Sequence, residues 1–76
     1  MSAEIFVHKC EFPIENDRYE IFIYCRPDGS HVAKTVLDAN DTIINDGSTL
    51  DEVLKKHKEL LPLAINSRRL FSRSRH

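Results

Sequence analysis

The chain has 76 residues, of which 41% are hydrophobic and 30% charged, and its net charge is −1. A chain of this length buries only about 60% of the surface that its unfolded form exposes, so it has room for one domain with one small core. No apolar run approaches the ~20 residues that span a bilayer. Residues 1–4 lack the basic start and apolar centre of a signal peptide. We therefore expect one domain of a cytoplasmic protein, bacterial in style.

Charge is distributed unevenly along the chain. Residues 1–66 hold seven Lys and Arg against all twelve acidic residues, a balance of −5, whereas residues 67–76 hold four Arg and no acid. The field of an acidic domain repels phosphate, which argues against nucleic-acid binding by residues 1–66. We predict a folded domain over residues 1–66 and a basic, disordered tail over residues 67–76. The tail holds the candidate basic patch: Arg68, Arg69, Arg73 and Arg75.

Segments rich in β-branched and aromatic residues alternate with turn signals through the first two thirds of the chain. We predict strands over residues 4–12, 18–26 and 31–37, with turns at 13–17 and 27–30, and a short fourth strand over residues 42–44. Pro27 and Gly29 make the second turn clear, because proline presets φ and glycine accepts a positive φ. Connections this short join antiparallel neighbours, so the strands should form a three- to four-stranded antiparallel meander.

A capped amphipathic helix follows the strands. Thr49 and Glu52 have the spacing of a capping box, in which each side chain accepts a hydrogen bond from the other residue's amide. Seven positions at helical spacing then form a largely apolar stripe along one face of the helix: Leu50, Val53, Leu54, His57, Leu60, Leu61 and Ala64. Pro62 lacks an amide hydrogen, so the helix should end, kink or restart there. The sequence thus predicts an α+β fold with one C-terminal helix packed on one face of the sheet.

Both faces of the predicted sheet carry apolar side chains. In the second strand Ile21 and Ile23 point to one face, and Phe22 and Tyr24 point to the other. One helix covers only one face, so the second apolar face suggests another cover. A second copy or a protein partner could supply it, the segment after Pro62 could fold back over it, or the aromatic side chains could simply lie exposed. The candidate interface residues are Phe22, Tyr24, Phe6 and Phe12.

The two cysteines are predicted to be free. If the first hairpin is centred on residues 13–17, paired residue numbers sum to about 30, which places Cys10 and Cys25 on opposite faces and roughly 16 Å apart along the strands. A disulfide needs Cα atoms within ~7 Å, and a zinc site needs every ligand within ~2.3 Å of one ion. We therefore expect no disulfide, no metal and no cofactor.

Catalytic residues are not evident either. Cys25 and His31 flank a hairpin, but no third residue that could orient them is apparent. Gly29 and Gly47 are the only glycines, so the chain holds no glycine-rich phosphate loop. His57 lies on the apolar helix stripe, either as a boundary residue whose ring packs or as a titrating group that needs a polar partner beneath the sheet. We predict that the protein is not an enzyme.

Residues 46–54, Asp-Gly-Ser-Thr-Leu-Asp-Glu-Val-Leu, resemble the helix-opening G-x-T-L-x-E-A-L pattern of HicB-like antitoxin domains. The resemblance covers residues 31–65. It implies a small β-β-β-α-β module that oligomerises and masks a toxin partner. The family's Pro-Gly-Cys element before the helix is replaced here by residues 38–42, and no strand-like run follows the helix. The resemblance therefore supports the layering of a helix on a sheet.

These observations favour a small non-catalytic protein-binding or regulatory module that self-associates as a homodimer or binds a protein partner, without a membrane or a metal. The alternative is a HicB-like antitoxin or nucleic-acid-linked regulator that uses the basic C-terminal tail, whose four Arg could neutralise phosphates.

Overall fold

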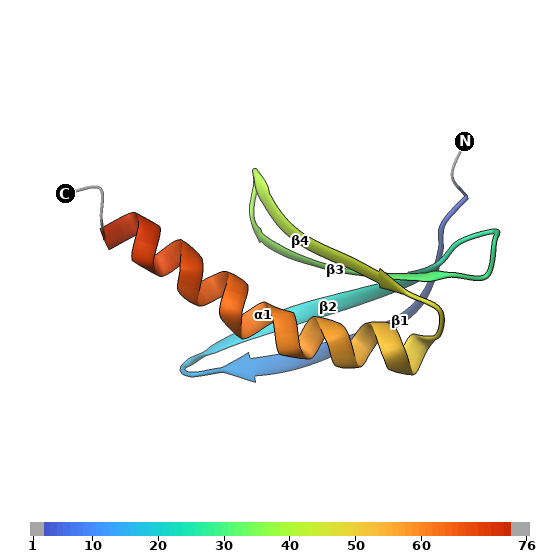
Figure 1. Cartoon of the computed structure of the whole chain (residues 1–76), viewed down its shortest axis with the longest axis horizontal. Helices are drawn as coiled ribbons and strands as arrows, with labels where there is room; N and C mark the ends of the chain where they lie inside the picture. Colours follow the sequence, from blue (N-terminus) through green and yellow to red (C-terminus); the bar gives the residue numbers. More distant parts are fainter. Residues whose placement is uncertain (1–2, 74–76) are drawn as a thin grey trace.

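Four strands are followed by one long helix. The computed structural model describes residues 3–73, and the side chains of residues 3–70. The elements are β1 (Ile5–Ile14), β2 (Asp17–Cys25), β3 (His31–Asp38), β4 (Asp41–Gly47) and α1 (Leu50–Arg73). The strands pair in chain order in one antiparallel sheet, and α1 crosses one of its faces (Figure 1). The predicted α+β meander with a C-terminal helix is confirmed, and β4 is longer than the predicted fourth strand.

The first hairpin turns at an unexpected residue. Ile14 pairs with Asp17, which leaves Glu15 and Asn16 as a two-residue loop, and Glu15 has a φ of 56°. A positive φ at the first loop position alone is the pattern of a type II′ turn, where glycine is the usual residue. In the next connection Gly29 has a φ of 88° and its amide donates to the Arg26 carbonyl at 2.9 Å, so the predicted turn at residues 27–30 is confirmed.

A β-bulge near Val7 changes the face that the rest of β1 presents. Phe6 pairs with Tyr24, but His8 pairs with Ile23 and Cys10 with Ile21. A one-residue slip moves every later side chain to the other face. The prediction of one constant register was therefore wrong beyond Phe6, as was the placement of the two cysteines on opposite faces. Cys10 lies opposite Ile21, which precedes Cys25 by four residues, so the two cysteines are about 13 Å apart along the strand. Both thiols are free.

The core lies between the sheet and α1. Its buried side chains come from β2, β3, β4 and the helix: Ile21, Ile23, Ala33, Ile43, Val53, Leu61 and Ile65. Leu61 is fully buried, as its place on the predicted stripe requires, whereas Leu54 is only partly buried at the margin of the core. Leu60, the other stripe leucine of that turn, is 37% exposed. The buried stripe is thus narrower than predicted.

The helix begins where predicted and extends further. Thr49 Oγ1 accepts from the Glu52 amide at 3.1 Å, and the Glu52 carboxylate accepts from the Ser48 amide, rather than the Thr49 amide, at 3.4 Å. α1 continues through Pro62 to Arg73, so residues 67–73 are helical and not the predicted tail; residues 74–76 lie outside the described residues. Pro62 removes only the bond to the Lys58 carbonyl, and burial of Ile65 keeps the following turns against the sheet.

The two hairpins diverge toward their tips. β2 and β3 pair only from Phe22–Lys34 to Cys25–His31. Each hairpin's own ladder continues to its tip, at residues 14–17 for the first and 38–41 for the second. The sheet is therefore joined at one end and open at the other, and Figure 1 shows the second half of α1 passing the open end.

Candidate interaction surface

Three aromatic rings gather on the sheet face opposite α1, which we call the outer face. The Phe6 ring lies 5.7 Å from the Tyr24 ring, edge to face, and 6.3 Å from the Phe22 ring, centroid to centroid. Phe6 is 53% exposed, and Phe22 and Tyr24 are half-buried. The structure thus brings together three of the four residues that the sequence nominates for an interface, on neighbouring strands β1 and β2.

Phe12, the fourth nominated residue, lies on the other face. The bulge in β1 pairs it with Tyr19, and it packs against the core under α1. The Nζ atom of Lys58, a helix residue, lies 5.8 Å from the centre of its ring. Its assignment to the outer face was wrong because simple alternation along β1 does not account for the bulge.

The apolar part of the outer face continues onto β3 and β4. Lys34 pairs with both Phe22 and Ile44, and Val36 pairs with Thr42, so these side chains share the face of the aromatic rings. Ile44 is 54% exposed and Val36 is 62% exposed. Sequence reasoning missed these two, although their even numbers continue the alternation of β2. We call Phe6, Phe22, Tyr24, Val36 and Ile44 the outer-face patch.

The charged groups of the outer face neutralise one another. Lys9 Nζ lies 2.8 Å from Glu20 and 5.6 Å from the centre of the Phe22 ring. Lys34 Nζ lies 2.9 Å from Glu4 and 4.9 Å from the centre of the Tyr24 ring. Each lysine therefore has a carboxylate partner and also lies over an aromatic ring.

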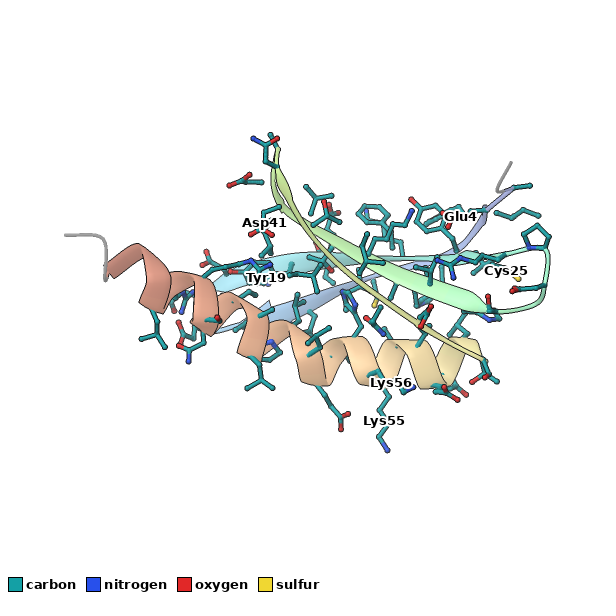
Figure 2. The ribbon with its side chains drawn as sticks, turned by 45° about the horizontal axis from the view of Figure 1, so that its top comes forward. Glu4, Tyr19, Cys25, Asp41, Lys55 and Lys56 are labelled. Atoms are coloured by element: carbon teal, nitrogen blue, oxygen red, sulfur yellow. The ribbon has the colours of Figure 1, made fainter. Side chains whose placement is uncertain are left out.

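Glu4 links two of these cations. Its carboxylate accepts from Lys34 and, at 3.4 Å, from Arg26, and the hydrogen bond from Lys34 is the largest cause that lowers the pKa of Glu4. Figure 2 shows Glu4 on the side of the sheet away from α1. Arg26 also lies 3.5 Å from Asp46, and Arg18 lies 3.7 Å from Glu11. The positive and negative charges of these ion pairs balance, so the apolar groups of the outer face are surrounded by charged side chains with no net charge.

The opposite face contains a buried polar chain centred on His57. His57 and Thr35 are both fully buried, and the His57 Nε2 and Thr35 Oγ1 atoms are 2.7 Å apart. Nδ1 contacts Asn45 Oδ1, and the Asn45 amide nitrogen donates to the Val53 carbonyl at 3.2 Å. This orientation of Asn45 assigns the hydrogen to Nδ1, so that Nε2 accepts from the threonine hydroxyl.

The His57 chain favours the neutral imidazole. Burial lowers the pKa of His57, because the charged form loses its hydration. The polar partners of His57, which could not be identified from the sequence, are Thr35 on β3 and Asn45 on β4. All ring hydrogen-bonding atoms are satisfied within the core, and the group holds α1 to both strands rather than opening to a cavity.

Among the described residues, the two others considered for chemistry are not hydrogen-bonded to each other. Cys25 and His31 are paired in register, but the Cys25 thiol donates to the Arg26 carbonyl at 3.6 Å. His31 Nδ1 is buried and has no partner among the described residues. Within residues 3–73 no group of three or more His, Cys, Asp or Glu is arranged to hold a metal ion. In the same range no helix is long and apolar enough to cross a membrane.

The predicted basic patch is not a free surface in its described part. Arg68 binds Asp41 through two nitrogens, at 2.5 and 2.9 Å, and Arg69 binds Glu15 at 2.5 Å. The Arg73 side chain and Arg75 lie outside the described residues. An open cavity of about 300 Å³ lies beside the two pairs, with Tyr19, Leu37 and Ile65 among its lining residues. Figure 2 shows Tyr19 and Asp41 at this end of the sheet, near the second half of α1.

Comparison with protein-family models, with curated proteins and with solved structures finds no match to this chain.

Proposed function

We propose that this chain is a small non-catalytic protein-binding module that self-associates through its outer face. The observation that carries the proposal is the outer-face patch, where three aromatic and two aliphatic side chains share a sheet face that α1 leaves open. Aromatic side chains combine large contact areas with a low cost of ordering, and they are enriched at the centres of protein interfaces. We also propose the cytoplasm as its compartment, in keeping with two free thiols.

A second copy is the occupant that the charges favour. The ion pairs of the outer face already balance within one chain, so two such faces can approach without net repulsion. In a two-fold dimer the same patch meets itself, and a patch without net charge does so without meeting an excess of its own sign. The fold-back alternative has less support, because Ile65 is buried under the other face and Leu70 is 58% exposed.

The size of the face limits the strength of the dimer. Four strands at ~4.8 Å spacing and about seven residues of length give a projected area of roughly 450 Å². A standard interface covers about 800 Å² on each partner. We therefore expect a transient dimer whose population depends on concentration.

Sedimentation velocity over a concentration series tests the proposal. We expect the full chain to dimerise, and Phe6→Asp to weaken the dimer by at least about tenfold, since a buried unpaired charge is costly at an interface. Leu63→Asp is the matched control, because Leu63 is 71% exposed on α1 and should leave the dimer unchanged. Circular dichroism would check that both variants are folded.

Two results would contradict this function. A chain that stays monomeric at high concentration does not self-associate. Equal effects of the two Asp variants on dimerisation would show that the interface does not lie on the outer face. Fluorescence anisotropy with labelled single-stranded RNA and DNA addresses the alternative, a HicB-like or nucleic-acid-linked regulator. Salt-sensitive binding that is lost in Arg73→Gln/Arg75→Gln would favour that alternative instead.

A further inference from the structure

Two consecutive arginines of α1 reach different hairpins. Arg68 binds Asp41 at the tip of the β3–β4 hairpin, and Arg69 binds Glu15 in the loop of the β1–β2 hairpin. Arg69 Nη2 also lies 3.8 Å from Asp17, on the other side of the same loop. Successive residues of a helix point about 100° apart, so one turn of α1 can contact both tips.

These contacts lie where the sheet itself supplies none. The β2–β3 ladder ends at Phe22–Lys34, and beyond that pair the two hairpins are not hydrogen-bonded to each other. The cavity of about 300 Å³ lies in the same region, between Tyr19 of the first hairpin and Leu37 of the second. The separation of the tips therefore depends on the helix that crosses between them.

Arg68 is the better-anchored of the two arginines. Its guanidinium holds both oxygens of Asp41 and also donates to the Ala64 carbonyl at 3.0 Å, one turn back along α1. Two-point pairing fixes the direction as well as the distance of the contact. The hydrogen bond from Arg68 lowers the pKa of Asp41, and the hydrogen bond to Glu15 raises the pKa of Arg69.

We propose that Arg68 and Arg69 form a brace that holds the two hairpin tips at a fixed separation and so sets the shape of the outer face. This inference rests on the proposed function, because the outer-face patch is divided between the hairpins. Phe6, Phe22 and Tyr24 lie on the first hairpin, whereas Val36 lies on the second, beyond the last β2–β3 pair. Movement of the tips changes the position of Val36 relative to the rings.

Amide hydrogen exchange of the full-length chain, resolved by NMR, tests the brace one tip at a time. Arg68→Gln should speed exchange in residues 36–42, and Arg69→Gln should speed it in residues 12–19, each by roughly two- to fivefold. Exchange in the joined part of the sheet, residues 22–25 and 31–34, should not change. Lys55→Gln is the matched control, since Lys55 is an exposed helix cation that points away from the sheet (Figure 2).

Salt and charge exchange separate the brace from simple packing. Added NaCl screens exposed ion pairs, so it should speed exchange at the tips of the wild type and not at those of the Arg68→Gln/Arg69→Gln variant. Arg68→Asp combined with Asp41→Arg should restore slow exchange in residues 36–42. Unchanged exchange at both tips in the double Gln variant, or equal salt effects in it and in the wild type, would overturn the brace.

Sedimentation velocity tests separately whether the brace affects dimerisation through the outer face. The double Gln variant should dimerise more weakly than the wild type, whereas Lys55→Gln should not. Looser tips with unchanged dimerisation would contradict the link and leave the proposed function intact. A monomeric wild type whose tips still respond to the Gln variants would contradict the proposed function and the link, but not the brace.

Discussion

The helix-covered face and the outer face are formed by alternate residues of the same strands, yet they accommodate polar groups differently. Under α1 the polar groups are neutral and form one chain, from the fully buried Thr35 and His57 to the partly buried Asn45. On the outer face they are charged, partly exposed and paired around aromatic rings. The first arrangement suits a permanent contact within the chain, since unpaired buried groups are costly. The second suits a surface that can exchange water for a partner.

The largest difference between the faces should appear when a leucine is truncated. Leu61 is fully buried under the sheet, so Leu61→Ala should lower the free energy of unfolding by about 2–5 kcal/mol through lost burial and the cavity left behind. Leu63, two residues later, is 71% exposed, and Leu63→Ala should change it by less than ~0.5 kcal/mol. Urea denaturation measures both. Similar losses in the two variants would show that the core is not where the structure puts it.

A hydroxyl under the helix should matter more than one on the outer face. Thr35→Val keeps the shape of the side chain but leaves Nε2 of His57 without its donor, which should cost about 1–3 kcal/mol. Thr42→Val, at an exposed position of β4, should fall within ~0.5 kcal/mol of the wild type. The same denaturation experiment decides this. A harmless Thr35→Val would mean that the buried chain does not contribute to stability.

The buried chain also predicts how stability depends on pH. Burial holds the pKa of His57 below its ordinary value of about 6.5, so the folded state binds fewer protons than the unfolded state between those two values. The contribution of His57 is therefore fully present above about pH 6.5 and declines as pH falls toward the lowered pKa. Unfolding free energies measured from pH 8 to pH 5 should show this decline. His57→Gln should flatten it, and an unchanged slope in that variant would assign the decline to other groups.

The smallest effect on folding should come from the outer-face patch. Val36 is 62% exposed, so Val36→Thr should change the free energy of unfolding by less than ~0.5 kcal/mol when measured in dilute, monomeric solution. Val53→Thr introduces the same hydroxyl at a fully buried helix position and should cost about 1–3 kcal/mol. Comparable losses would indicate that Val36 is already covered within the monomer.

Features with strong local signals were predictable from the sequence. The strand order, the Pro27–Gly29 turn and the helix start at Leu50 follow from residues whose preferences agree with the fold. The bulge near Val7 was not predictable, because no glycine or proline marks it. The sequence-based prediction therefore placed Phe12 on the wrong face of the sheet. Glu15 with a positive φ is contrary to its residue type.

The remaining misses depend on contacts between residues distant in the chain. Pro62 predicts that the helix ends, kinks or restarts, yet Ile65 and the pairs of Arg68 and Arg69 hold the following turns in place. The partners of His57 lie 12 and 22 residues away, on two strands. No local pattern in the sequence predicts either arrangement.

The place of α1 over the sheet also bears on the order in which the chain folds. The helix packs chiefly on β4 and β3, its nearest neighbours in sequence. Contacts between nearby segments cost little loop-closure entropy and form early in folding. We expect the β3–β4 hairpin and the first half of α1 to make up the folding nucleus, and β1–β2 to dock afterwards. Substitutions at Val53 should then slow folding, whereas substitutions at Phe12 should mainly speed unfolding.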